Sequence, residues 1–519
     1  MNTKALKQKI LDLAIHGKLL PLEKVEQIRK EEPASKLLEK IRTEKQEKIA
    51  KGEQKKDKND SFIFVGDDKR HYEKFTDGTI KDMEDEIPFD VPDGWSWCRL
   101  GEICNFIGGG TPDKTNQNYW NGNIHWASVK DIKGDNLFST EDKITELGLK
   151  ESSANLAKID DIILITRISP GKAIITKIET AINQDLKIVI PIIELEKYFL
   201  LYFFQTNESD FIENSSGTTV KGIKLEYLLS KFIPLPPLAE QKLIVEEIEK
   251  IFAQIDQLEQ NKTDLQTAIK QAKSKILDLA IHGKLVPQDP NEEPASVLLE
   301  KIHAEKEAKI AKGELKRDKN DSYIYKGSDN CHYEKFADET EEEIEVPFEL
   351  PNGWCWGKLK DSGIVTDTGY PFNASNFTTD PKNRKQIIRI RDILRGYSET
   401  YSDEQCPTSY IVNKGDILVG MDGDFNVGKW KTEVALLNQR VCRIKKEYNA
   451  IILDYVFYLL PIPLLEINKN TSSVTVKHLS NKQIENLIFP IPPLNEQTRI
   501  VSKIEELFSI LDNISLNLV

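Results

Sequence analysis

The chain has 519 residues, 39% of them hydrophobic and 30% charged, with a formal net charge of −13. This length predicts three or four compact units, and the acidic balance argues at first against nucleic acid as a partner. Met1–Ile10 carries three lysines and no apolar run, and no stretch offers about 18 consecutive apolar residues. We therefore expect neither export nor a membrane partner, and a cytoplasmic location.

The first segment of the chain is repeated near its middle. Residues 9–21 (KILDLAIHGKLLP) return at 275–287 (KILDLAIHGKLVP) with one change in 13 positions. EEPASKLLEKI at 31–41 returns at 292–302 as EEPASVLLEKI, and the segments DKNDS and HYEKF follow in both copies. Two copies are too few for a stacked repeat array. The interpretations left are a pseudo-twofold molecule and a plain tandem duplication with no functional twofold.

Each copy continues into an arm that is rich in lysine and glutamate. A helix is predicted to begin near Pro33 in the first arm and Pro294 in the second, and to end at Gly52 and Gly313. An aromatic strand follows in each arm, at 62–64 and 323–325. A solvated helix would explain this composition. The near-identity of the two arms instead favours one partner surface presented twice.

Two modules that differ in sequence follow the arms, at residues 91–236 and 350–493. Each opens with a Pro-x-Gly-Trp-x-Trp turn, and short β-branched runs bounded by Gly, Asn and Asp come next. These runs predict strands at 161–166, 173–176, 187–190, 416–419 and 440–444. Helices are expected near 196–206 and 454–460. We interpret each module as mixed α/β.

A long helix is predicted between the modules. Apolar residues recur there at alternating spacings of four and three from Ile244 to Leu279, which is a heptad seam. The helix should run from Leu238 to His282, on the order of 65 to 70 Å, and stop at Gly283. The stretch 494–519 repeats 238–263 and Met1–Leu19 repeats 267–285, so the repeat is circular. The predicted fold class is α+β, with two α/β modules joined by a long antiparallel coiled coil.

Motifs for catalysis are missing from the sequence. It contains neither Asn-Pro-Pro-Tyr nor Asp-Pro-Pro-Tyr, which hold a flipped adenine in amino-methyltransferases, and no GxxxxGK[ST] phosphate loop. The six cysteines form no CxxC pair, so we expect free thiols in place of zinc ligands or disulfides. We therefore expect no catalytic residue, no metal and no cofactor in this chain.

Polar loops and a basic run distinguish the modules. Gly108–Trp120 (GGGTPDKTNQNYW) holds no aliphatic residue and offers amides, hydroxyls and Lys114, the groups that contact base edges and phosphates. Its counterpart is Gly369–Asp380 (GYPFNASNFTTD). Lys382–Arg395 carries six basic residues and one acidic residue. On composition alone an ordinary surface loop and a solvated face are the better explanations. The position of the basic run inside a divergent module favours phosphate binding, and loops at the same place with different residues are what two readers of two sequences would show.

Four segments together resemble the specificity subunits of type I restriction-modification enzymes. They are GGGTPDKTNQNYWNGNIHWASVKDIKG (108–134), GDILVGMDGDFNVGKW (415–430), LNQRVCRI (437–444) and SSVTVKHLSNKQIENLIFPIPPLNEQ (472–497). The resemblance covers nearly the whole chain. It implies two target-recognition domains, each reading one half of a bipartite DNA sequence, on an antiparallel helix pair that docks two modification subunits. One departure is that residues 166–171 (TRISPG) stand where the second module has 420–424 (GMDGD), so roles need not transfer between modules.

On this resemblance the chain divides into seven regions. These are 1–20, a helix completing the distal conserved region; 21–90, an arm; 91–236, the first target-recognition domain; 237–286, the central helix; 287–349, the second arm; 350–493, the second target-recognition domain; and 494–519, the C-terminal helix. The implied partners are double-stranded DNA, two modification (methyltransferase) subunits and restriction subunits. S-adenosylmethionine, ATP and Mg are then expected on those partners.

The candidate DNA-binding residues are polar or basic and lie in the divergent loops. In the first module they are Thr111, Lys114, Asn116, Gln117, Asn118, Tyr119 and Lys130. In the second they are Asn373, Ser375, Asn376, Lys382, Arg384, Lys385, Arg389 and Arg391. Lys221 and Lys477, in matching Thr-Val-Lys triplets, are candidates for phosphate contact.

Two other functions fit the same sequence features. One is a scaffold or regulator that binds DNA or protein without directing an enzyme. The other is a degenerate or phase-variable copy whose module no longer reads DNA. The sequence does not tell which bases are read, how long the spacer is, or whether the complex cleaves as well as methylates.

Overall fold

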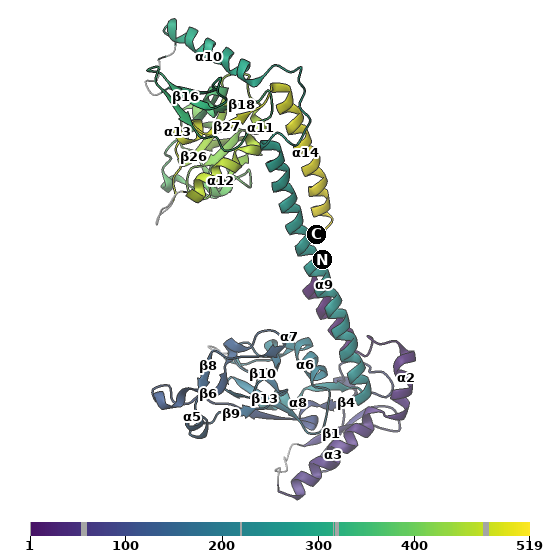
Figure 1. Ribbon diagram of the computed structural model, residues 1–519. Coiled ribbons are helices and arrows are strands. Elements are labelled where there is room, and N and C mark those ends of the chain that lie inside the picture. Colours follow the sequence, from purple (N-terminus) through teal and green to yellow (C-terminus); the bar gives the residue numbers. More distant parts are fainter. Residues whose placement is uncertain are drawn as a thin grey trace. The chain divides into compact units, whose positions relative to one another are not determined.

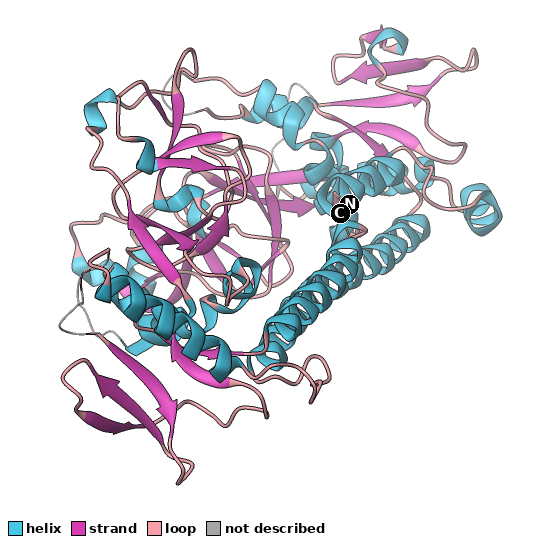
Figure 2. Ribbon diagram, turned by 90° about the horizontal axis from the view of Figure 1, so that it is seen from above, coloured by secondary structure: helices cyan, strands magenta, loops and turns pink. Residues whose placement is uncertain are grey.

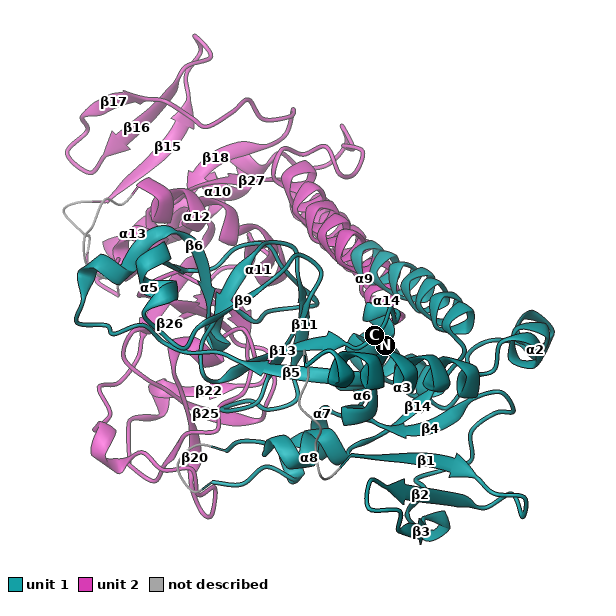
Figure 3. Ribbon diagram, turned by 90° about the horizontal axis from the view of Figure 1, so that it is seen from below, with its two compact units in different colours: residues 1–261 teal, residues 262–519 magenta. Residues whose placement is uncertain are grey.

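The computed structural model of the chain describes residues 2–52, 60–217, 221–314, 316, 321–470 and 477–518 (Figure 1). The chain divides into two compact units, residues 1–261 and 262–519 (Figure 3). The expectation of three or four units was wrong. In each unit the largest buried cluster contains residues of both the module and the helices, so the helices do not form a separate body.

Helix α9 (Leu238–Ile281) passes from the first unit into the second. Its 44 residues confirm the predicted long helix to within one residue. Gly283 follows in the left-handed conformation with φ +65, and its N–H donates to the carbonyl of Ala280. The predicted glycine stop is therefore confirmed.

One helix runs antiparallel to α9 in each unit. In the first unit it is α1 (Thr3–Ile15), whose Lys7 ammonium lies 2.5 Å from the Asp256 carboxylate. In the second it is α14 (Leu494–Leu516), which lies beside α9 (Figure 1). Its Asp512 carboxylate lies 2.5 Å from the ammonium of Lys273. An ion pair thus links α9 to its neighbouring helix within each unit.

The seam is buried only in part. Ile248 and Ile255 are buried, whereas Leu258 and Leu265 are 54% and 40% exposed. The seam prediction also missed a second apolar face of α1, which packs into the core of the module. That face consists of Leu11, Ala14 and Ile15.

Each arm consists of a helix and a three-stranded sheet. Helices α3 (Ala34–Ala50) and α10 (Ala295–Ala311) begin directly after Pro33 and Pro294, as predicted. The sheets are β1 (Ser61–Val65), β2 (His71–Phe75) and β3 (Ile80–Asp82), and β15 (Ser322–Lys326), β16 (His332–Phe336) and β17 (Glu341–Ile344). A further helix, α2 (Leu22–Glu31), was not predicted, although its apolar residues Leu22, Val25 and Ile28 recur every three positions.

One sheet of each module has a strand register that the other module repeats. Its order is β5 (Cys104–Gly108), β13 (Leu186–Pro191), β10 (Ile162–Ile165), β11 (Ala173–Thr176) and β7 (Asn136–Leu137) in the first unit. In the second it is β19 (Ile364–Thr368), β26 (Val441–Lys446), β23 (Ile417–Gly420) and β24 (Val427–Lys429). Ile162 lies opposite Val189, and Ile417 lies opposite Ile444. The two registers are thus related by an offset of 255 residues, and all five predicted strands are confirmed.

The second sheet of each module has four strands in one shared arrangement. Figure 2 shows the strands of the chain in magenta and its helices in cyan. The orders are β8 (Asp142–Ile144), β6 (Trp120–Ala127), β12 (Thr180–Ile182) and β9 (Asn155–Ala157), and β21 (Tyr401–Ser402), β20 (Lys385–Ile388), β25 (Val434–Leu437) and β22 (Ile411–Asn413). In both, the central pair is parallel and the outer pairs are antiparallel. Two-stranded ribbons join the ends of the modules: β4 (Ser96–Arg99) with β14 (Phe232–Leu235), and β18 (Cys355–Lys358) with β27 (Ile488–Ile491).

Short helices complete the modules. In the first they are α4 (Leu100–Ile103), α5 (Glu146–Lys150), α6 (Lys197–Thr206), α7 (Glu208–Glu213) and α8 (Leu225–Ser230). In the second they are α11 (Leu453–Leu459), α12 (Pro461–Asn470) and α13 (Asn481–Glu485). Both predicted helices, α6 and α11, are confirmed. Six consecutive buried residues of α6, from Phe199 to Phe204, explain why it forms the centre of the first core.

Candidate nucleic-acid interface

The parallel strand pairs place two loops of each module at one edge. Ala127 of β6 lies opposite Ile182 of β12, and Ile388 of β20 lies opposite Leu437 of β25. The carboxyl ends of parallel strands meet at the same edge of a sheet, where ligands commonly bind. The residues that follow therefore form equivalent edges, which we call the strand-end edges: 128–131 with 183–185, and 389–392 with 438–440.

A buried aspartate shapes the first loop of each strand-end edge. The Asp131 carboxylate accepts from the backbone N–H of Ser128 at 2.9 Å, and the Asp392 carboxylate accepts from that of Arg389 at 3.1 Å. These contacts close the 3₁₀ turns η3 (Val129–Asp131) and η6 (Ile390–Asp392). Both aspartates are buried, whereas the residue before each of them is exposed. These two exposed residues, Lys130 and Arg391, are predicted DNA-binding residues at equivalent positions of the two turns.

A close backbone approach joins the strand-end edge to the predicted recognition loops. The N–H of Gly110 donates to the carbonyl of Ile182, and that of Tyr370 to the carbonyl of Leu437. A Cβ on the preceding Gly109 or Gly369 would lie under 3.0 Å from the neighbouring backbone. Both loops therefore leave β5 and β19 through a glycine that the packing requires.

The second module presents three arginines and two amides around a shallow pocket of about 290 Å³. Its lining is Arg389, Ile390, Arg391, Asn438, Gln439 and Arg440. The Oδ1 atom of Asn438 is buried without a hydrogen-bond partner in the described part of the chain. Guanidinium and amide groups are the donors that match the major-groove edges of guanine and adenine. The pocket thus brings two predicted residues, Arg389 and Arg391, together with three that the prediction did not include.

Sequence analysis missed Asn438, Gln439 and Arg440 as site residues. A signal was present, since an Asn-Gln pair directly follows β25 and recurs as Asn183 and Gln184 after β12. The pair recurs at the offset of 255 that relates the strand registers. A pair kept in two otherwise divergent modules indicates a shared role at the edge.

Hydrogen bonds hold the loop 111–119 of the first module at both ends. The Thr111 hydroxyl donates to Gln184, and the buried Trp126 indole donates to the carbonyl of Gly110 at 3.0 Å. Further along, the Trp120 indole donates to the carbonyl of Asp113 at 3.1 Å. Between these points Lys114, Gln117 and Asn118 are exposed, while Asn116 and Tyr119, like Thr111, are half-buried.

Lys130 is held by two carboxylates. Its ammonium lies 2.9 Å from Asp142 and 3.0 Å from Glu141. These hydrogen bonds, first that of Asp142, raise the pKa of Lys130. Because two acidic groups already offset its charge, a contact with phosphate would need the lysine to leave them. The prediction for Lys130 stays a prediction.

The predicted DNA-binding residues before β20 differ in whether other side chains hold them in place. Glu404 accepts from the backbone N–H of Asn373 at 3.1 Å and from the Asn376 amide at 3.0 Å, which fixes the turn around Ser375. Arg384 is held by Asp380 at 2.6 Å. Lys382 and Lys385 are exposed.

Lys221 and Lys477 occupy the same backbone position but hold their side chains differently. The carbonyl of Lys221 accepts from the N–H of Ile168 at 2.9 Å, and that of Lys477 accepts from the N–H of Gly423 at 3.1 Å. Lys221 is exposed, whereas the Lys477 ammonium donates to the carbonyl of Asn468. The residues before each lysine in the predicted triplets lie outside the described residues.

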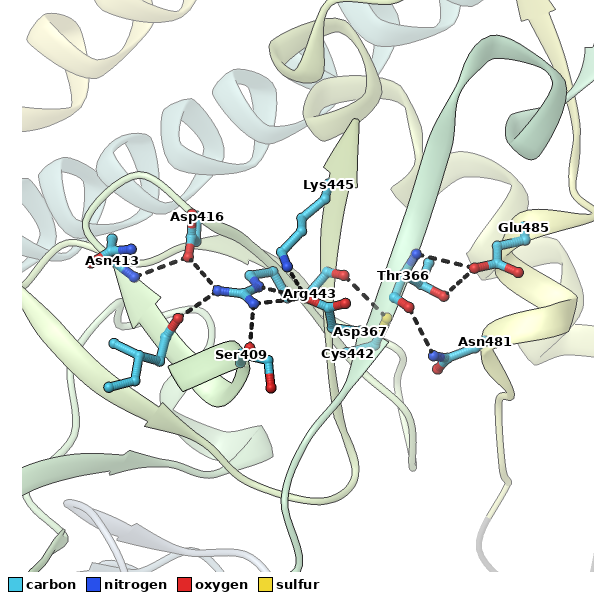
Figure 4. A network of polar contacts seen from close by, with 11 residues as sticks. Thr366, Asp367, Ser409, Asn413, Asp416, Cys442, Arg443, Lys445, Asn481 and Glu485 are labelled. Carbon is cyan, nitrogen blue, oxygen red and sulfur yellow. Dashed lines mark hydrogen bonds and ion pairs between the residues drawn. The ribbon is translucent and has the colours of Figure 1, made fainter. Parts of the chain in front are cut away.

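One arginine of the second module is buried in its sheet. Arg443 lies between Asp367 and Asp416 (Figure 4), at 2.7 Å and 3.2 Å from their carboxylates. Its guanidinium also donates to the carbonyls of Ile411 and Ser409. Its side chain is 5% exposed. Arg443 therefore stabilises the module and is not available to a ligand.

Comparison with known proteins identifies the family. A family model described as the type I restriction modification DNA specificity domain matches residues 92–267 and 351–517. The chain belongs to the type I restriction-modification specificity subunits. As a specificity subunit it is the non-catalytic, targeting subunit of such an enzyme.

Individual relatives agree with this assignment. The EcoAI specificity subunit of Escherichia coli is 28% identical over 97% of this chain and 88% of its own length. The EcoBI specificity subunit of Escherichia coli is 39% identical over 33% of this chain and 36% of its own length. A chain from a solved type I R-M system superposes with a TM-score of 0.52 at 18% identity, covering 83% of this chain and 94% of that one. The superposition supports the fold.

Other classes of site are not seen in the part of the chain that the structure describes. Within those residues, no group of three or more His, Cys, Asp or Glu side chains could hold a metal ion. All six cysteines are free thiols, as predicted. Burial raises the pKa of Cys98 and Cys104. No described helix is both long and apolar enough to cross a membrane.

Proposed function

We propose that this specificity subunit reads a bipartite sequence in double-stranded DNA in the cytoplasm, one half with each module. One observation carries the proposal: the two modules repeat the backbone of a strand-end edge and change the side chains that it presents. Ser128 and Lys130 stand where the second module has Arg389 and Arg391. Different donors on the same frame would read different base pairs.

Helices α1, α9 and α14 and the two arms would dock two modification subunits, which would methylate adenine in each half-site. Two arms with the same helix and sheet support two equal docking surfaces. Restriction subunits would join the same complex for cleavage. S-adenosylmethionine, ATP and Mg would be bound by these partners. The helices paired along α9 would form the antiparallel coiled coil of a pseudo-twofold molecule.

The proposal is tested by co-expressing the chain with its cognate modification subunit in a host without DNA methylation. N6-methyladenine is then mapped across the genome by long-read sequencing. We expect one motif of two short half-sites with a fixed gap, methylated once on each strand and lost when the chain is omitted. A stable complex that yields no motif would contradict the proposal and favour a scaffold or a degenerate copy.

The same assay tests the predicted second-module site. Arg391→Ala should relax the motif at one base pair of one half-site, because a bidentate contact to guanine contributes about 1 to 3 kcal/mol of discrimination. The other half-site should not change. Lys414→Ala, an exposed lysine of the same module, serves as the control. Equal weakening on all sequences would mark Arg391 as a phosphate contact instead.

A further inference from the structure

An ion pair at the strand-end edge occurs in both modules with its charges exchanged. In the first module Arg167 Nη1 lies 3.2 Å from Asp185 Oδ1. In the second, Arg440 Nε lies 3.7 Å from Asp422 Oδ2. At the offset of 255, Asp422 stands in place of Arg167 and Arg440 in place of Asp185.

The backbone around the exchanged pair is the same in both modules. The N–H of Thr166 donates to the carbonyl of Asp185 at 2.9 Å, and that of Met421 to the carbonyl of Arg440 at 2.9 Å. Ile168, with φ +77, and Gly423, with φ +78, both follow the first member of the pair. The sequence difference between TRISPG and GMDGD therefore leaves this geometry intact. The exchange moves the guanidinium to the neighbouring strand end, a step of about 4.8 Å.

In both modules the carboxylate is the inner member of the pair and the arginine is the outer one. The Asp185 and Asp422 side chains are 11% and 19% exposed, against 48% and 60% for Arg167 and Arg440. The carboxylates have other donors as well. The Asn183 amide donates to Asp185 at 3.1 Å, and His478 Nδ1 lies 2.6 Å from Asp422. Each carboxylate is thus a fixed support, and each guanidinium faces outward.

The pairing favours a base over a phosphate as the ligand of these arginines. A carboxylate beside a guanidinium offsets the positive charge that attracts phosphate, but it leaves a planar set of directional N–H donors. Such a fork matches the O6 and N7 acceptors of guanine in the major groove. Arg440 also lines the pocket with Arg389 and Arg391, and its φ of +71 is an uncommon conformation for a residue other than glycine.

We propose that Arg167 and Arg440 each read a guanine in their half-site, and that Asp185 and Asp422 position them. The inference rests on the proposed function and deepens it. Because the charges are exchanged, the two modules would present this arginine from different strand ends, and so to different positions of their half-sites. The exchange would be one way in which duplicated modules acquire different specificities on one frame.

The test uses the full chain in complex with its modification subunit, with the methylome and DNA binding as readouts. Arg440→Ala should reduce discrimination at one guanine of the second half-site about tenfold to a hundredfold and leave the first half-site unchanged. Arg167→Ala should do the reverse. Arg440→Lys keeps the charge but loses the fork, so it should not restore the base preference.

The exchange variant Asp422→Arg with Arg440→Asp preserves the ion pair and guards against a simple loss of folding. It should keep complex assembly and alter the second half-site at another position. Uniform weakening on all sequences, rescued by Arg440→Lys, would overturn the inference in favour of a phosphate contact. Unchanged half-sites in all variants, beside a clear wild-type motif, would overturn it while sparing the proposed function. A wild-type complex without a motif would overturn both.

Discussion

The buried guanidinium of Arg443 bridges two strands and two loops of the second module (Figure 4). In the first module the equivalent position on β13 is Ile188, opposite Ile163. A cation with carboxylates and carbonyls therefore stands in one core where an apolar contact stands in the other. The partners Asp367 and Asp416 are about a third exposed, so loss of the arginine leaves them partly hydrated.

Arg443→Met should lower the free energy of unfolding by about 2 to 3 kcal/mol, less than the roughly 3 to 5 kcal/mol of a fully buried ion pair because both carboxylates are partly hydrated. Urea denaturation followed by tryptophan fluorescence measures this change. Lys445 pairs with the same Asp367 but is 42% exposed, so Lys445→Met should cost about 0.5 kcal/mol. Equal losses in both variants would show that burial is not what makes Arg443 important.

A carboxyl group stands at the start of each module, at equivalent positions: Glu102, which is buried, and Asp361, which is half-buried. Burial raises the pKa of Glu102 to about 6 from 4.5, although Arg42 lies 2.7 Å away, and burial raises the pKa of Asp361 to about 6. Between pH 4.5 and 6, Glu102 thus binds a proton more tightly in the folded state than in the unfolded chain. The stability that Glu102 contributes is full below about pH 4.5 and is lost as the pH rises through 6.

Glu102→Gln should remove about 2 kcal/mol from the pH dependence of unfolding between pH 4 and 7, since the shift of about 1.5 units in pKa is worth that much. The measurement compares the unfolding free energy of wild type and variant across this range. Only the slope of the unfolding free energy against pH is informative, because the variant also changes the contact with Arg42 and so shifts the whole curve. Parallel curves for the two proteins would contradict a raised pKa.

At the scale of elements, the glycines that open the recognition loops make a local test of the strand-end edge. A Cβ on Gly109 would press on the carbonyl of Ile182, whereas one on Gly108 would meet only the Lys187 ammonium, at 3.7 Å. Gly109→Ala should destabilise the chain by about 2 kcal/mol or more, and Gly108→Ala should cost far less. Urea denaturation of both variants measures the difference. Similar urea midpoints for the two variants would show that the loop can move away from the strand end without loss of stability.

The sequence predicted elements where periodicity is local. The runs that became β10 and β26 and the long apolar seam of α9 are such patterns, and the glycine after α9 marks its end. The parallel pairing of β6 with β12 and of β20 with β25 was not predicted, because it joins strands about 50 residues apart with no pattern linking them.

The same limit applies to the candidate site. Lys130 and Arg391 were predicted from composition, yet their equivalence became visible only through the paired strands and the buried aspartates behind them. Arg440 was missed because its strand end meets Arg389 through tertiary structure alone. The charge exchange between Arg167 and Arg440 likewise depends on register, which the sequence patterns leave open where two modules diverge.

At the scale of the whole molecule, α9 is the element that belongs to both units. Its exposed seam residues, Leu258 and Leu265, flank the boundary between them and contribute little to either buried core. The length of α9 can therefore be changed there without opening a core. If the helix sets the gap between half-sites, the gap should follow its length.

Insertion of one heptad between Leu258 and Leu265 adds about 10.5 Å of helix and keeps its faces nearly in phase. This length equals the rise of about three base pairs, so the gap should lengthen by about that number. Both half-sites should stay the same, because neither strand-end edge is altered. Methylome mapping with the co-expressed modification subunit measures gap and half-sites together. The control, Leu258→Ala with Leu265→Ala, should leave the gap unchanged, and an altered half-site in the insertion variant would refute the role of α9 as a spacer.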